Sequence, residues 1–360
     1  MKNQKVLENI NSVKKKISKV SAESMFYYDR GAYNTHSKQK KNVEIIAISK
    51  LVNNEIEEAI KVFEELTILS PQSHRPYYLL AVSFEKQNKI LEAIESIKKS
   101  LQINPEDETS QFFYARVLLK TRKFQEAQKA LSNLQEKHPT SAALKELQSK
   151  IFLAKKQPKE AIRLLEEALK HGKSSNRIIL LSAAQFQYGD ESSSRRTLET
   201  WLEKYPEDLL VRNTLAQNLL LKDMYDDALL HYKIIVSQRS DLASAQNTYA
   251  WLLFKKGKLD KAYKHATVAY NKSPTNPGIQ DTLGVIFIAK GKTREGLELL
   301  RKAEDQLPNN PGIKIHIAQA LIKLNILSDA KKILENILSS KKMFKERKLA
   351  TELLEQLSNQ

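Results

Sequence analysis

The sequence predicts an all-α protein, a solenoid of stacked helix pairs that repeat about every 34 residues. The first observation is that six prolines recur at this interval or at about twice it: Pro71, Pro105, Pro139, Pro206, Pro274 and Pro308. The second is a small residue that lies twelve positions before each of these prolines and at the matching place in the other repeats: Ala59, Ala93, Ala127, Ala161, Ser194, Ala228, Ala262, Gly296 and Ala330. The third is composition, because 9 Gly and 10 Pro in 360 residues are too few for the turns of an all-β protein of this size.

Each repeat is expected to hold two amphipathic helices joined by a short turn. Ile94, Ile97 and Leu101 show the spacing of an apolar helix face. Small residues let the two helices of a pair approach closely, where a larger side chain would overpack. The proline ends the second helix, because the residue before a proline avoids the α region. One helix pair cannot bury its apolar face alone, so the pairs must stack.

We expect nine repeats within a domain covering residues 40–340. They begin near residues 40, 74, 108, 142, 175, 209, 243, 277 and 311. The interval from Pro139 to Pro206 is 67 residues, one short of two periods. The repeat near residues 142–174 and its neighbour therefore share a deletion of one residue.

The repeated residues resemble the tetratricopeptide repeat (TPR) family. The match is fullest in two stretches, one with Tyr77-Tyr78-Leu79-Leu80-Ala81, Ala93 and Pro105, the other with Leu283-Gly284, Gly296, Ala303 and Pro308. The resemblance implies a right-handed superhelix whose first helices line a concave groove. It also implies a non-catalytic scaffold or adaptor that binds a peptide or a partner helix in that groove.

In this register the fifth and ninth residues of each repeat should face the groove. Asn213, Asn247 and Asp281 occupy fifth positions 34 residues apart and should form a polar ladder, flanked by Gln217 and Trp251 at ninth positions. Asn amides can hydrogen-bond a peptide backbone, and an exposed Trp is a plausible binding hot spot. Alternatively, the Asn side chains bond to their own helix backbone and Trp251 packs against a neighbour.

Earlier repeats add an apolar subsite to the expected groove. Tyr78 and Phe112 occupy fifth positions there, and Arg116 occupies a ninth position. Glu146 and Ile315 occupy fifth positions in other repeats and are also expected to face the groove.

The segments outside the repeats are expected to cap the solenoid. Residues 1–39 are basic and carry an apolar seam with spacings of four and three residues: Val6, Ile10, Val13, Ile17 and Val20. We interpret this segment as an N-terminal helix or degenerate repeat that packs on the first repeat. The alternative is a basic amphipathic helix for an anionic membrane or a partner helix. Residues 341–360 predict a polar C-terminal capping helix.

The composition limits location and cofactors. The absence of Cys excludes disulfides, cysteine-ligated zinc and cysteine nucleophiles. No run of 18 apolar residues occurs, and Met1 to Val20 lacks the apolar core of a secretory signal, so we expect a cytoplasmic protein without a transmembrane segment.

The formal net charge of +17 leaves a second function class open. A basic solenoid could bind nucleic acid or an anionic glycan through its lysines. The alternative is a compositional bias with solvated lysines, favoured because Arg, which specific phosphate recognition prefers, is much rarer than Lys. The sequence does not fix the oligomeric state.

No catalytic motif accompanies the repeats. Gly291-Lys292-Thr293 is similar to the end of a P-loop, but Ile286 stands where that loop needs its first Gly. His231 and His265 lie one period apart, which favours surface positions on neighbouring second helices over a metal site. We therefore expect no enzyme activity, no cofactor and no metal.

A narrower resemblance covers residues 247–338. The words Asn247-Thr248-Tyr249-Ala250-Trp251-Leu252, Asp281-Thr282-Leu283-Gly284 and His316-Ile317-Ala318-Gln319-Ala320-Leu321 are similar to TPR proteins of bacterial surface-polysaccharide assembly and export. This resemblance implies a subunit of such a system as an alternative function.

Overall fold

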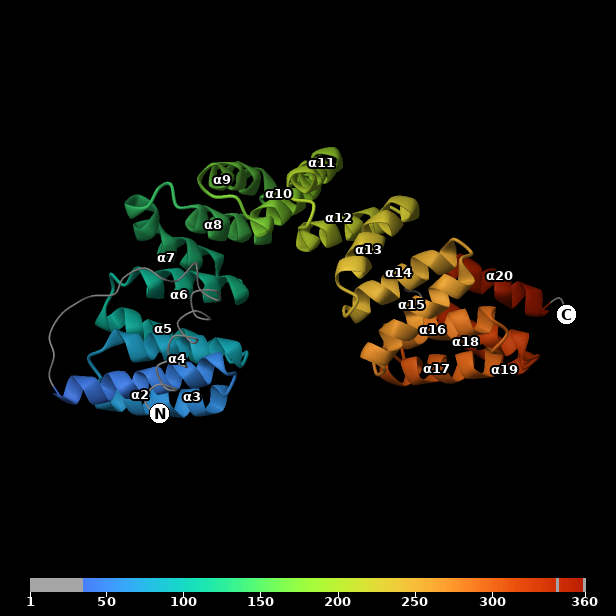
Figure 1. Cartoon of the computed structure of the whole chain (residues 1–360), viewed down its shortest axis with the longest axis horizontal. Coiled ribbons are helices and arrows are strands. Elements are labelled where there is room, and N and C mark those ends of the chain that lie inside the picture. The colour runs from blue at the N-terminus through green and yellow to red at the C-terminus, as the bar shows by residue number, and fades with distance from the viewer. Residues whose placement is uncertain (1–34, 341–342, 359–360) are drawn as a thin grey trace. The chain divides into compact units, whose positions relative to one another are not determined.

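The computed structural model describes residues 35–340 and 343–358, and within them the chain is all-α. The nineteen helices of the described residues follow one another without a strand, which confirms the predicted fold class. The chain divides after Thr197 into two compact units. Figure 1 shows the helices of each unit stacked in chain order as successive pairs. The N-terminal seam from Val6 to Val20 lies outside the described residues.

The first unit contains four complete helix pairs and the first helix of a fifth. Its helices are α2 (Thr35–Val52), α3 (Ile56–Leu69), α4 (His74–Lys86), α5 (Ile90–Ile103), α6 (Glu108–Lys120), α7 (Phe124–Lys137), α8 (Ala142–Ala154), α9 (Pro158–His171) and α10 (Ser175–Tyr188). Helix α11 (Glu191–Lys204) contains the boundary between the units.

The second unit contains four helix pairs and a last helix. Its helices are α12 (Leu209–Leu221), α13 (Tyr225–Gln238), α14 (Ala243–Lys255), α15 (Leu259–Lys272), α16 (Pro277–Ala289), α17 (Thr293–Gln306), α18 (Pro311–Lys323), α19 (Leu327–Ser339) and α20 (Arg347–Ser358). Helix α20 packs against α19, and its Ala350 is fully buried in the cluster that α18 and α19 form.

The turn between the two helices of each pair requires a left-handed backbone. One residue with positive φ lies in this turn in all nine pairs: Asn54, Asn88, Arg122, Lys156, Gly189, Asp223, Gly257, Gly291 and Asn325. Gly adopts this conformation without steric cost and Asn adopts it readily, whereas Arg and Lys do not. The turns at Arg122 and Lys156 are therefore strained.

The one-residue deletion lies in the loop between α9 and α10. Only residues 172–174 separate these helices, whereas four residues separate each other second helix from the next first helix between α3 and α18. Gly172 ends α9 where most other repeats have a proline just beyond the helix. The deletion thus falls between repeats, and α10 has 14 residues where the other first helices from α4 to α18 have 13.

Small residues form the contact between the helices of each pair. The small residue of every second helix is buried, from Ala59 to Ala330, and so is the small residue at the eighth position of each first helix. Where α10 and α11 meet, Ser182 and Ser194 replace the two alanines, and their hydroxyl oxygens lie 2.8 Å apart in a hydrogen bond. Gly284 and Gly296 allow a close approach of α16 and α17, because a Cβ on Gly296 would lie 2.6 Å from the carbonyl oxygen of Gly284.

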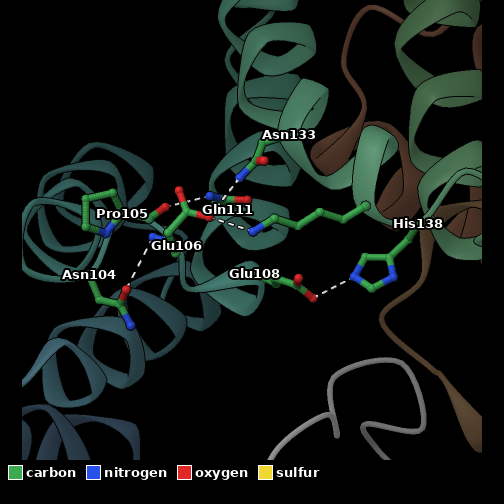
Figure 2. Close-up of polar contacts among 8 residues, drawn as sticks. Asn104, Pro105, Glu106, Glu108, Gln111, Asn133 and His138 are labelled. Atoms are coloured by element: carbon green, nitrogen blue, oxygen red, sulfur yellow. Dashed lines mark hydrogen bonds and ion pairs between the residues drawn. The ribbon is translucent and has the colours of Figure 1, made fainter.

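A polar side chain near the start of several first helices ties that helix to the loop before it. The Gln111 amide donates to the carbonyl oxygen of Pro105 (2.5 Å), as Figure 2 shows. The same bond to the carbonyl six residues back is made by Arg212 to Pro206, Gln246 to Ser240 and Gln280 to Pro274. After the short loop, the donor is Arg177, which reaches Gly172 five residues back (2.9 Å).

The loop between α5 and α6 is also held by α7, the second helix of the repeat that follows the loop. Lys137 donates to Glu106 (2.6 Å) and the Asn133 amide donates to the same carboxylate oxygen (3.3 Å), while His138 donates to Glu108 (2.9 Å; Figure 2). The hydrogen bonds from Lys137 and Asn133 hold the pKa of Glu106 below its ordinary value. These bonds fix α6 and α7 to the loop that follows α5, and so join two successive helix pairs at this loop.

We predict that glycine at the strained turns stabilises the protein. Arg122→Gly and Lys156→Gly should each raise the free energy of unfolding by roughly 0.5–1 kcal/mol, because Gly removes the cost of positive φ. Asn88→Gly is the matched control and should change little. The measurement is the urea midpoint followed by circular dichroism. A gain for Asn88→Gly as large as for Arg122→Gly would contradict the explanation.

We also predict that Gly296 tolerates no larger side chain. The Cβ of Gly296→Ala would lie 2.7 Å from Ile288 Cγ1 as well as against the Gly284 carbonyl, so overpacking should cost about 1–3 kcal/mol. Gly278→Ala is the control, because its Cβ would meet nothing closer than 3.4 Å. Thermal unfolding of the two variants tests this, and equal midpoints would show that α16 and α17 can move apart freely.

Candidate partner-binding face

The fifth and ninth positions of the first helices are the candidate site in each unit. At the fifth position Tyr78, Phe112, Asn213, Asn247 and Asp281 are half-buried. At the ninth position Arg116 and Gln217 are exposed and Trp251 is half-buried. Side chains at these positions thus touch neighbouring helices and also reach the surface.

Asn247 on α14 has an unusual environment. Its Oδ1 is buried and has no hydrogen-bond partner among the described residues. A buried acceptor that is left unpaired costs about 1–3 kcal/mol. This oxygen therefore makes no bond to helix backbone.

Asp281 on α16 is already paired with the next repeat. The His316 Nδ1–H on α18 donates to Asp281 Oδ1 (2.7 Å). Asn213, on α12, precedes Asn247 by one period, and Gln217 follows Asn213 by one helical turn on the same face. The three residues of the polar ladder and the two that flank it, Gln217 and Trp251, all belong to the second unit.

Trp251 is held by aromatic and cationic neighbours. The edge of its ring system meets Tyr225, the first residue of α13, with centroids 5.3 Å apart and planes at 79°. The Lys255 ammonium lies 5.5 Å from the ring centroid, within the range of a cation–π contact. Trp251 therefore packs against a neighbour, as one alternative expected, and still keeps part of its surface exposed.

Tyr225, which contacts Trp251, is also hydrogen-bonded to the carboxylate of Asp223. Its hydroxyl donates to Asp223 Oδ1 (2.5 Å), and Lys345 Nζ donates to the same oxygen (2.8 Å). The hydrogen bonds from Lys345 and Tyr225 lower the pKa of Asp223, and the bond to Asp223 raises the pKa of Tyr225. The 34-residue register did not predict that Asp223, Tyr225 and Lys345 form this chain of contacts to Trp251.

The subsite in the first unit is built around Phe113. The Tyr78 ring meets it edge-on at 5.6 Å, and burial raises the pKa of Tyr78. The Arg116 guanidinium lies 5.0 Å from the Phe113 ring centroid and pairs with Glu85 (2.6 Å). Phe112 packs against the core cluster that α6, α7 and α8 form. Tyr78 and Arg116 thus share one aromatic neighbour.

Two other fifth positions do not face a surface, which corrects the expectation for them. Ile315 is 1% exposed and lies in the core of α18 and α19. Glu146 is 5% exposed and pairs with Arg177 Nε (3.2 Å) and Lys150 (2.7 Å). Glu146 is buried because Arg177, which ties α10 to the short loop, lies against it.

The two periodic histidines lie on second helices and contact first helices. His265 Nδ1 lies 2.7 Å from the Gln246 amide oxygen and His231 Nδ1 lies 3.2 Å from Arg212, so each contacts the residue that locks its repeat's loop. Burial lowers the pKa of His265. The described residues contain no group of three His, Asp or Glu side chains placed to hold a metal ion.

Family models match most of the repeats. Two tetratricopeptide repeat models match residues 152–217 and 287–346, and residues 115–177. A model described as anaphase-promoting complex, cyclosome, subunit 3 matches residues 52–134.

The chain is a tetratricopeptide repeat protein. The matched residues span parts of α6 to α12 and of α16 to α19 and extend to Glu346, so the TPR resemblance inferred from the repeated residues is confirmed. The similarity to polysaccharide-assembly proteins stays a prediction.

Solved structures share the TPR fold. A chain of the Cut9–Hcn1 hetero-tetramer of the APC/C superposes with a TM-score of 0.51 at 14% identity, covering 91% of this chain and 64% of that one. A tetratricopeptide repeat protein from Parabacteroides merdae gives 0.48 at 16% identity, covering 69% and 99%. MamA from Desulfovibrio magneticus gives 0.44 at 17% identity, covering 49% and 99%. No curated protein sequence matched the chain significantly.

We predict that removing Arg177 from its buried ion pair with Glu146 destabilises the protein. Arg177→Met should lower the free energy of unfolding by about 3 kcal/mol, because Glu146 then lacks its buried partner. Adding Glu146→Met should recover most of the loss. Lys150→Met, at a side chain 41% exposed, should cost about 1 kcal/mol or less. Urea denaturation measures all three, and equal losses for Arg177→Met and Lys150→Met would refute the buried pair.

Proposed function

We propose that this TPR protein is a non-catalytic interaction scaffold, and that the first-helix face of its second unit binds an extended peptide or a partner helix. The observation that carries the proposal is the pairing of Asn247 with Trp251. They lie four residues apart on α14, so they share one face of the helix. Asn247 has a buried amide oxygen without a hydrogen-bond partner, and Trp251 has a partly exposed aromatic ring.

The chemistry of this pair suits a peptide. A rotation of the Asn247 side chain toward the surface would let a backbone N–H of the partner donate to Oδ1, which removes the cost of a buried, unpaired acceptor. An amide accepts such a bond whatever the peptide's side chains are. Trp251 would add a large contact area that is already held in place by Tyr225. Asn213, Gln217 and Asp281 extend the polar surface along the neighbouring first helices.

In the first unit, Tyr78, Phe112 and Arg116 form a separate candidate subsite. Its aromatic side chains are half-buried, and the Arg116 side chain is 46% exposed beside them. This arrangement suits an apolar side chain of the partner with an acceptor next to it.

Binding of nucleic acid or an anionic glycan is the second candidate function. It is less favoured because several lysines are already paired with carboxylates of neighbouring repeats. Lys120 pairs with Glu85 (2.7 Å), Lys256 with Asp226 (2.5 Å) and Lys290 with Asp260 (2.5 Å). These lysines hold successive repeats together. A cytoplasmic location stays a prediction; within the described residues, no helix has the length and apolarity to span a membrane.

The test is a pull-down from lysate with wild-type protein and the double variant Asn247→Ala/Trp251→Ala. We expect a protein partner that the wild type keeps at about 1 M salt, where the Debye length is about 3 Å. The double variant should lose at least about tenfold in affinity for it. Asn271→Ala/Asn336→Ala, at exposed positions on second helices, is the matched control.

Two results would contradict the proposal. One is a partner that the double variant retains as well as the wild type does. The other is recovery of nucleic acid or glycan that salt removes steeply, by about one log unit per log unit of salt for each phosphate contact. The second result would assign the function to the basic charge.

A further inference from the structure

The segment before α20 reaches back to the start of the second unit. Lys345 Nζ donates to Asp223 Oδ1 at 2.8 Å, although 122 residues separate them in the sequence. Asp223 is the left-handed residue of the turn between α12 and α13.

This contact ends on the candidate binding face. Asp223 accepts from Tyr225, and Tyr225 meets the ring of Trp251. Lys345 is thus linked through Asp223 and Tyr225 to Trp251, the side chain to which we assign partner binding. The carboxylate of Asp223 and the two aromatic rings form one continuous surface that a basic side chain of the chain itself occupies.

The two parts of the C-terminal segment are held differently. Helix α20 is anchored, because Ala350 is fully buried and Phe344, Leu353 and Leu357 pack against the core of α18 and α19. The side chains of Lys345 and Asp223 are 72% and 56% exposed. An exposed ion pair contributes little to stability, so Lys345 can leave Asp223 while α20 stays in place.

The sequence around Lys345 shows what the surface accepts. Met343, Phe344 and Lys345 bring a basic residue preceded by apolar ones. Met343 is 85% exposed, whereas Phe344 is anchored and has the Arg347 guanidinium 5.7 Å from its ring centroid. The Lys345 side chain therefore makes the bond to Asp223, whereas the apolar neighbour of the ligand is inferred from Trp251.

We propose that Asp223, Tyr225 and Trp251 recognise a lysine or arginine next to an apolar residue of a protein partner, and that Lys345 occupies this site in the free chain. The inference rests on the proposed function for the nature of the partner. The carboxylate supplies charge complementarity to the basic side chain, and Trp251 supplies the adjoining apolar contact. A partner must displace Lys345, so the C-terminal segment competes with it.

The experiment uses a fluorescently labelled peptide of residues 341–349, KKMFKERKL, and the full chain. Anisotropy titrations compare wild-type protein with Lys345→Ala. Because Lys345 no longer competes in the variant, the peptide should bind it between about twofold and fivefold more tightly. A peptide carrying Glu in place of Lys345 should not bind. Asp223→Asn, introduced into the Lys345→Ala chain, should abolish binding of the original peptide.

The control chain is Lys348→Ala. Lys348 is exposed and pairs only within α20, with Glu352 at 3.9 Å, so this variant should bind the peptide as the wild type does. Equal binding by wild type and Lys345→Ala overturns the competition. Equal binding of the two peptides, or no binding at all, overturns the assigned chemistry. The peptide titration and the lysate pull-down use different ligands. Failure of the peptide to bind rejects the site at Asp223, whereas loss of a lysate partner by Asn247→Ala/Trp251→Ala would still support the proposed binding face.

Discussion

The close approach of two helices across a pair of small residues is the constraint on which each repeat depends. At Ala250 and Ala262 only methyl groups lie between the backbones, and at Gly284 and Gly296 no side chain does, so the two helices of each pair approach closely. That contact sets how the chain must reverse between them, and the reversal needs one left-handed residue. Helix spacing and turn conformation therefore act as one unit in each repeat.

Polar side chains carry the order from one repeat to the next. Gln111 and its counterparts bind the loop that enters their helix, while Lys137, on the second helix of the same repeat as Gln111, binds that loop as well. Apolar burial is non-directional, whereas these bonds have fixed partners. The bonds thus specify the register of stacking, and the core supplies most of its free energy.

The repeat could be read from the sequence because the small residues and prolines have one structural role each, and few other residues fulfil it. The half-buried state of Asn247 and Trp251 also follows from the register. The burial of Glu146 does not, since it depends on Arg177 being displaced by one position after the short loop. The contact between Lys345 and Asp223 was equally inaccessible, because a 34-residue period describes neighbours and these residues are 122 apart.

The turns at Arg122 and Lys156 belong to consecutive repeats, and the second of these repeats also contains the buried Glu146. A stack in which each repeat contacts only its neighbours has no global core to average out local costs. Its weakest repeats open first, with a free energy below that of complete unfolding. Amide protons of α6 to α9 should therefore exchange before those of α14 to α17. The free energy of local opening thus differs from repeat to repeat along the chain.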